Sequence, residues 1–267
     1  MLDIADLTVE GSFPLGAATA ASMMVAGFGP LTALLAAFVA GMLAGVVTGL
    51  LHTKMKIPAL LAGILTMIAL YSVNLRIMGK ANLSLLGVDT AFKIAKSVLD
   101  MPMAQTTLVV GLAVTLIVGL FMYWFFGTQI GAAIRATGFN QQMIRAQGVD
   151  TDITIILGLL LSNGLVAVSG ALVAQSNGFS DVGMGTGTIV IGFASVIIGE
   201  GLFGTRSFKN CLISVVLGSI VYRIVIAAVL AMGMPPNDLK LFTSVLVALA
   251  LSMPLIKAKM GGRKAVR

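Results

Sequence analysis

Charged residues are scarce in this chain. They make up 10% of its 267 residues, whereas hydrophobic residues make up 58% and the mean hydropathy is +1.05. A soluble domain carries about a quarter charged residues, so this composition excludes an ordinary water-soluble globular protein. The chain is predicted to be an all-α polytopic membrane protein, a bundle of apolar helices that cross the bilayer.

Cysteine and histidine are almost absent. The chain has one of each, Cys211 and His52, which excludes a disulfide framework and leaves no cluster for a metal ion. It also has no Gly-x-Ser-x-Gly motif and no phosphate-binding P-loop. We therefore predict no catalytic residue, metal or cofactor in this chain. The net charge of +7 lies beside the apolar runs and at the C-terminus, so it does not indicate nucleic-acid binding.

Long apolar runs are what the chain has instead. A helix needs about 20 apolar residues to cross a bilayer, and these continuous runs are too long for barrel strands. One membrane domain over residues 1–267 is expected. The candidate spans lie near 12–28, 30–51, 57–75, 105–126, 152–174, 186–204, 210–231 and 240–256.

The basic residues predict the orientation. Lys54 and Lys56 lie in one short loop and further Lys and Arg in the C-terminal tail, whereas the connections 175–185 and 232–239 have neither. Because Lys and Arg favour cytoplasmic loops, residues 52–56 and 127–150 and the C-terminus are placed in the cytoplasm. The stretch 80–104 is then a loop on the outer surface. It carries a short helix that Asp89 could cap, either packed along the membrane or contacting a partner.

Charges inside spans are costly, about 2.5–3.5 kcal/mol each at mid-bilayer. Glu200 is expected to form a structural ion pair with Arg206, and Arg223 to pair with a carboxylate from residues 3–10 or with Asp181. The helices from 30 to 175 offer no such charge in their interiors, although an ion-coupled carrier normally needs one. An ion-coupled secondary transporter and a membrane scaffold remain as alternatives.

Several polar residues could line a translocation pathway or act as its gate. Some lie in spans, some in the acidic N-terminal segment, and some in a glycine-rich outer connection. Hydrogen bonding between helices would explain the residues in spans equally well. These candidates are Asp6, Thr8, Glu10, Gly11, Asn74, Asn163, Asp181 and Gly187.

Residues 127–150 form a polar island between two apolar runs. Apolar side chains that could act as anchors alternate there with polar ones, and Gly138 and Gly148 are predicted to divide the island into two short helices. A short helix with a few anchors suits a groove on another protein. The alternative is an ordinary amphipathic loop. The predicted anchors are Ile130, Ile134, Phe139, Met143 and Ile144.

The run from Gly131 to Asp150 resembles the coupling-helix region of ABC importer permeases of the ribose and branched-chain amino-acid type. The segments 6–16, 56–67, 181–187 and 198–200 strengthen the match and point to the branch described as tryptophan/tyrosine transport permeases. The resemblance assigns ATPase coupling to Arg135, Ala136, Thr137, Gly138, Asn140, Met143 and Gly148.

This resemblance implies the permease subunit of an ATP-driven importer in the bacterial cytoplasmic membrane. The solute would be an amino acid, with aromatic ones among the candidates, or a similar small molecule. Its partners would be a second permease chain, forming a homodimer, two cytoplasmic ATPase subunits that hold ATP and Mg, and an extracellular solute-binding protein. Such permeases usually have a further apolar helix before the Asp-Leu-Thr segment, so we expect either a native helix missing from this chain or a shortened variant.

Overall fold

The computed structural model describes residues 4–204, 207–233, 235, 238, 241–245, 247–248 and 252. Within these residues, six helices are long and apolar enough to cross a membrane. The prediction of an all-α polytopic membrane protein is therefore confirmed, with fewer spans among the described residues than the eight predicted. The chain forms two compact units, Met1–Thr186 and Gly187–Arg267, and each is described by itself.

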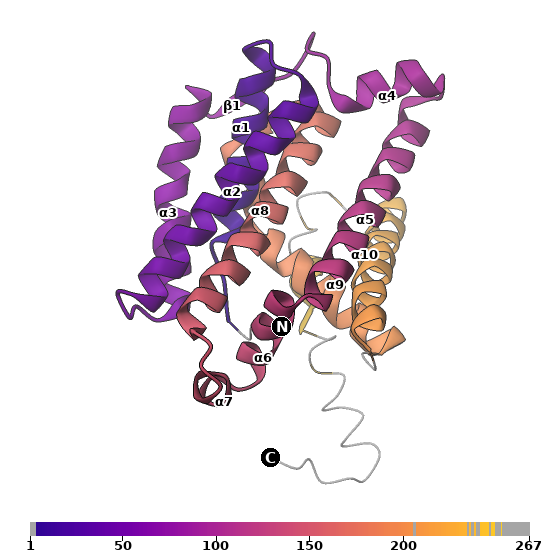
Figure 1. Cartoon of the computed structure of the whole chain (residues 1–267). Coiled ribbons are helices and arrows are strands. Elements are labelled where there is room, and N and C mark those ends of the chain that lie inside the picture. The colour runs from indigo at the N-terminus through magenta and orange to yellow at the C-terminus, as the bar shows by residue number, and fades with distance from the viewer. Residues whose placement is uncertain are drawn as a thin grey trace. The chain divides into compact units, whose positions relative to one another are not determined.

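Four helices form the core of the first unit, and Figure 1 shows them side by side. They are α1 (Val9–Val25), α2 (Pro30–Thr53), α3 (Ala59–Met78) and α8 (Thr151–Asn177). The remaining elements of this unit connect these helices or extend from their ends. They are β1 (Asn82–Ser84), α4 (Ala91–Leu99), α5 (Met103–Gly127), α6 (Gln129–Phe139), α7 (Gln141–Ala146), β2 (Phe179–Asp181) and the 3₁₀ turn η1 (Val182–Gly185).

Helix α1 is the central helix of this core rather than a lipid-facing span. The sequence predicts a span over 12–28, but the helix has 17 residues and buries most of them. Its neighbours reach it through glycines. A Cβ added at Gly170 of α8 would lie 1.9 Å from the carbonyl oxygen of Phe13, and one added at Gly16 would lie 1.9 Å from that of Ala167. Helices α1 and α8 are therefore in backbone contact.

Three more glycines lie where α2 packs against α8. Gly41, Gly45 and Gly49 recur every four residues, so they share one face of α2. A Cβ at Gly41 or Gly45 would come within 2.4 Å or 2.3 Å of a carbonyl oxygen of α8. Small residues at this spacing let two helix backbones approach closely in lipid, where van der Waals packing drives association.

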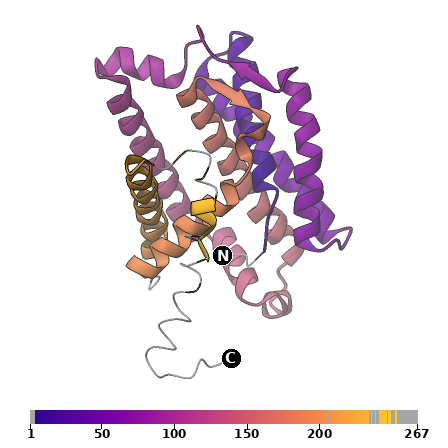
Figure 2. The ribbon, with the colours of Figure 1, turned by 180° about the vertical axis from the view of Figure 1, so that it is seen from behind.

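The first unit has two distinct ends. One, here called the basic end, carries the loop between α2 and α3 together with α6 and α7 (Figure 1). The other, the far end, carries α4 and a small ribbon in which β1 pairs antiparallel with β2 (Figure 2). The sequence predicts only a loop there, because strands of three residues are too short for an alternating pattern to reveal.

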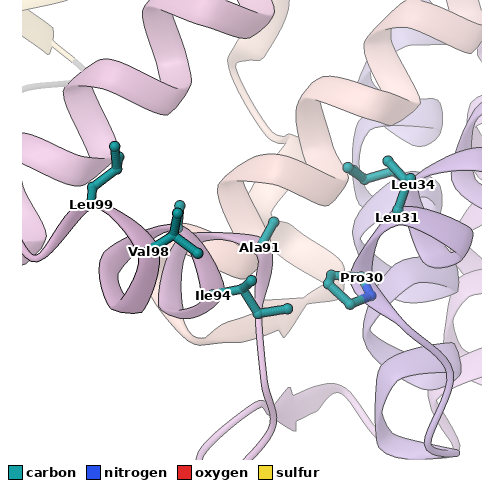
Figure 3. A pocket seen from close by; sticks show the side chains of 8 residues that line it. Pro30, Leu31, Leu34, Ala91, Ile94, Val98 and Leu99 are labelled. Atoms are coloured by element: carbon teal, nitrogen blue, oxygen red, sulfur yellow. The ribbon is translucent and has the colours of Figure 1, made fainter.

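Helix α4 lies in the predicted outer loop, but its cap differs from the expectation. The Thr90 side chain, not Asp89, accepts the hydrogen bond from the backbone N–H of Lys93, at 3.3 Å. The backbone N–H of Ala91, the first residue of this helix, donates to Oε1 of the buried Gln175 at 2.9 Å. This hydrogen bond connects α4 to α8. Its apolar face borders a hollow of about 390 Å³ between α4 and the first turns of α2 (Figure 3). The hollow is lined by Pro30, Leu31, Leu34, Ala91, Ile94, Ala95, Val98 and Leu99.

The second unit contains the helices α9 (Thr188–Phe203) and α10 (Phe208–Ala231). Their contact again depends on small residues, since a Cβ at Gly218 would lie 2.1 Å from the carbonyl oxygen of Ser195. These helices confirm the apolar runs predicted at 186–204 and 210–231. Most of the candidate span 240–256 falls outside the described residues.

Candidate translocation pathway and coupling region

A buried hydrogen-bond network joins the N-terminal segment to α8. The side-chain amide of Asn163 donates to Oδ2 of Asp6 at 2.7 Å, and its Oδ1 accepts from the hydroxyl of Ser12 at 2.6 Å. Asn163 and Ser12 are completely buried. The other carboxylate oxygen of Asp6 accepts the backbone N–H of Thr8 at 2.9 Å. The half-buried Asp6 carboxylate is thus held by two donors at the edge of this network.

A second group of buried hydroxyls extends this network to α2 and α3. Thr8 and Thr48 share a hydrogen bond of 2.7 Å, and Thr48 donates to Thr66 at 3.0 Å. All three residues are buried. The segment before α1 is therefore bonded through side chains to α2 and α8, and through Thr48 to α3.

The network lies deep in the bundle. Asn163 stands near the middle of α8, which has 27 residues and so is about 40 Å long. The half-buried Asp6 carboxylate is accordingly held beside the middle of α8.

Asn74 of α3 approaches the same segment from the other side. Its side-chain N–H₂ donates to the carbonyl of Gly11 at 3.4 Å, while its Oδ1 accepts no hydrogen bond among the described residues. Near this point η1 packs against the first turn of α1, where a Cβ at Gly185 would lie 2.0 Å from the Glu10 carbonyl oxygen. Pro14 cannot donate to that carbonyl, which leaves it accessible to η1.

The structure thus gathers five of the predicted pathway residues around one segment: Asp6, Thr8, Gly11, Asn74 and Asn163. Glu10 lies in the first turn of α1 beside them. Asp181 does not join the network, because its carboxylate accepts from the backbone N–H of Gly183 and from Asn82 at the far end. Gly187 has φ of +85° and precedes α9 in the second unit.

Sequence reasoning missed three members of this network, Ser12, Thr48 and Thr66. Each lies in a helix among small apolar residues, and a hydroxyl there is commonly bonded to the carbonyl one turn before, as Thr66 also is to that of Ala62 at 3.0 Å. Only the helix packing shows that these hydroxyls face Asn163 or one another. The central side chains of the network are buried.

At the basic end, α6 is fixed by one inward face. The side chains of Ile134 and Thr137 are buried, and the Thr137 hydroxyl shares a hydrogen bond of 2.9 Å with that of Thr154 in α8. A Cβ at Gly131 would lie 2.3 Å from the Phe125 carbonyl, so α6 turns back tightly against the end of α5. Thr128 caps α6 by accepting the N–H of Gly131 at 3.3 Å.

The break between the two helices of the island is at Asn140, not at Gly138. Gly138 lies within α6, whereas Asn140 adopts extended backbone angles and its side chain accepts the N–H of Met143 at 3.0 Å. Asparagine is a strong N-cap, which explains why α7 starts here. Gly148, with φ of +83°, follows α7 as predicted.

The island presents some of its predicted residues and buries others. Phe139 is 90% exposed and Met143 46% exposed, whereas Ile134 and Ile144 are buried and so are not available as anchors. Of the residues assigned to coupling, Thr137 faces α8, and the rest are exposed or half-buried: Arg135, Ala136, Gly138, Asn140, Met143 and Gly148.

Asp152, in the first turn of α8, is a residue that the sequence reasoning did not single out. Its carboxylate lies 3.4 Å from Arg145 of α7 and 3.7 Å and 3.9 Å from Lys54 and Lys56 of the α2–α3 loop. The Arg145 guanidinium also donates to the hydroxyl of Thr151 at 2.5 Å. The only signal in the sequence is an acidic residue at a helix start, which is common for structural reasons.

The predicted ion pairs in the second unit are not tested by the structure. Arg206 lies outside the described residues, so the pair with Glu200 stays a prediction. Arg223 is exposed on α10, in the second unit. Its predicted partners belong to the first unit, and that pairing also stays a prediction.

Comparison with known proteins identifies a family. Residues 1–252 match the family described as branched-chain amino acid transport system / permease component. A tyrosine transport system permease protein of Clostridioides difficile is 41% identical over 247 residues, which cover 92% of this chain and 81% of that protein. A galactofuranose transporter permease protein of Escherichia coli is 30% identical over 250 residues, covering 92% and 70%. An autoinducer 2 import system permease protein of Yersinia pseudotuberculosis is 29% identical over 202 residues, covering 73% and 54%.

No solved structure matches the chain. The family match and these relatives confirm the resemblance to ABC importer permeases and do not favour an ion-coupled carrier. A transporter component also agrees with the prediction that this chain is not an enzyme. The chain belongs to the family of branched-chain amino acid transport system permease components and is a multi-pass membrane permease of the ABC importer type.

Proposed function

We propose that this chain forms the translocation pathway of an importer for an amino acid, with aromatic amino acids as the first solutes to test. The tyrosine transport system permease at 41% identity motivates that choice of solute. A second copy of the chain would complete the pathway as a homodimer. An extracellular solute-binding protein would deliver the solute, and two cytoplasmic ATPase subunits would hold ATP and Mg and supply the energy.

The observation that carries this proposal is that α6 and α7 are anchored on one side and exposed on the other. Both helices are anchored to α8 on one side, by the Thr137–Thr154 hydrogen bond and by Arg145, and expose Phe139 and Met143 on the other. A movement of these helices would therefore be transmitted directly to α8. The basic residues around them favour the cytoplasmic side of the membrane, where an ATPase would bind.

Helix α8 then leads to the buried network. Its residue Asn163 holds Asp6 and Ser12, so a displacement of α8 would pull on the hydrogen bonds that close the bundle. We propose that the N-terminal segment is the gate. Separation of Asp6 and Thr8 from α8 and α2 would expose polar groups to a passing solute.

Co-purification of the permease with its ATPase tests the coupling assignment. Arg135→Glu and Gly138→Trp should each abolish the association, because one reverses a charge and the other adds a bulky ring on this surface. Lys96→Glu is the matched charge reversal on exposed α4 at the far end and should leave association intact. All variants must elute as the folded wild-type permease does. Retention of the ATPase by both island variants would show that α6 and α7 do not bind it.

A further inference from the structure

We infer that the α2–α3 loop is a second contact for the ATPase, joined to α7 through Asp152 into one docking surface. The inference rests on the proposed function, since it extends the surface that α6 and α7 offer. It assigns a role to Lys54, Met55 and Lys56, which lie far earlier in the chain than α6 and α7.

The loop has a defined conformation. The ring Nδ1 of His52 donates to the Ile57 carbonyl at 2.8 Å, and the backbone N–H groups of Met55 and Ile57 donate to carbonyls in the last turn of α2. Lys56 has φ of +58°, a left-handed conformation that is uncommon for a residue with a side chain. Such strained backbone persists where surrounding contacts hold it, and it clusters at functional sites.

This conformation presents one apolar side chain between two cations. Met55 is 65% exposed, and the side chains of Lys54 and Lys56 on either side of it are also mostly exposed. Methionine and a charged rim are typical of protein interfaces, where an apolar anchor enters a groove and polar groups surround it. The partner surface would therefore be an apolar groove bordered by carboxylates.

Asp152 makes this loop continuous with α7. Its side chain is only 19% exposed and receives Arg145 from α7 and both lysines from the loop. A single exposed ion pair contributes little, about 0–1 kcal/mol. Here, however, one carboxylate lies within ion-pair distance of three cations and offsets the repulsion among them. The first turn of α8 favours a negative charge at this position, which helps to fix the carboxylate.

The consequence is mechanical. An ATPase that gripped both the loop and α7 would move α2, α3 and α8 together, because Asp152 connects the loop to the start of α8. Those are the three helices that contribute Thr48, Thr66 and Asn163 to the buried network.

Site-specific photo-crosslinking in the full-length permease, co-expressed with its ATPase, tests the inference. p-Benzoylphenylalanine is placed at Met55, at Met143 of α7, or at Leu86, which is 87% exposed at the far end. Mass spectrometry then identifies the adducts. We expect the ATPase subunit to be attached at Met55 and Met143 and not at Leu86.

The outcomes separate the inference from the proposed function. An ATPase adduct at Met143, with none or only a phospholipid adduct at Met55, overturns the second contact and leaves the coupling role of α7 intact. Absence of an ATPase adduct at both positions overturns the proposed coupling surface as well.

The role of Asp152 has its own test in the same experiment. Asp152→Asn should lower the adduct yield at Met55 by about fivefold, because the loop loses the carboxylate that holds it beside α7. The yield at Met143 should fall less. Equal yields at Met55 with and without the substitution would show that Asp152 does not join the two segments.

Discussion

At the scale of single residues, the side chain of Asn163 has to satisfy several buried partners at once. One fully buried amide satisfies the Asp6 carboxylate, the Ser12 hydroxyl and the Leu159 carbonyl. The side-chain N–H₂ donates to Asp6 and to the Leu159 carbonyl, whereas the side-chain Oδ1 accepts from Ser12. No apolar residue of the same size could meet both demands.

Replacement of Asn163 by leucine should therefore destabilise the permease by about 1–3 kcal/mol, because Asp6 and Ser12 would each lose a hydrogen bond in a buried site. Asn82→Leu is the matched control, since the Asn82 side chain is exposed and donates a 3.3 Å hydrogen bond to Asp181. Thermal unfolding of the two detergent-solubilised variants measures the difference. Equal unfolding midpoints for the two would mean that the network contributes nothing to stability.

At the scale of helices, backbone contacts at glycines decide the packing. Helices α1 and α2 meet α8 at positions where even a methyl group would overlap a carbonyl oxygen. In contrast, α5 buries none of its apolar window, and a Cβ at its Gly111 would meet no atom within 4 Å. Glycine is thus required for close packing in one helix, whereas in another it has open space around it within the described part of the first unit.

Alanine substitutions at these two kinds of glycine should have opposite effects. Gly170→Ala adds a methyl group against the Phe13 carbonyl and should destabilise the fold by about 3 kcal/mol or more. Gly111→Ala should be neutral or stabilise α5 by up to about 1 kcal/mol, because alanine is the better helix former. Size-exclusion elution and thermal midpoints distinguish them. A Gly170→Ala permease as stable as Gly111→Ala would contradict the close packing of α1 and α8.

At the scale of the whole molecule, the first unit combines a buried polar network with the exposed surface of α6 and α7 that we propose as the ATPase contact. The spans between residues 30 and 175 carry charged residues only in their end turns, Arg76 in the last turn of α3 and Asp152 in the first turn of α8, so under the proposal the energy for opening the network arrives through α6 and α7. This arrangement suits a permease whose partner hydrolyses ATP.

Uptake by the complete transport complex in proteoliposomes should follow this expectation. With the binding protein outside and ATP inside, labelled tyrosine should accumulate, and a protonophore or a sodium ionophore should change the rate less than about twofold. Removal of internal ATP should abolish accumulation. Uptake that followed a proton or sodium gradient without ATP would instead establish an ion-coupled carrier.

The polar island, residues 127–150, has some features that follow from the sequence and others that do not. Its position and its two short helices follow from polarity and spacing between apolar runs. The burial of Ile134 and Ile144 does not, because an amphipathic pattern does not say which apolar side chains face the neighbouring helix. The break at Asn140 was missed because glycine is the more familiar helix terminator.

The sequence by itself determined that this protein is a membrane protein, the approximate positions of its helices in the chain, and the family to which it belongs. Those properties depend on composition and on local motifs. Only the tertiary structure decided that Asp6 meets Asn163, that Thr8 meets Thr48, and that Asp152 joins the α2–α3 loop to α7. Such contacts link residues far apart in the chain, and they depend on which faces of the helices pack together.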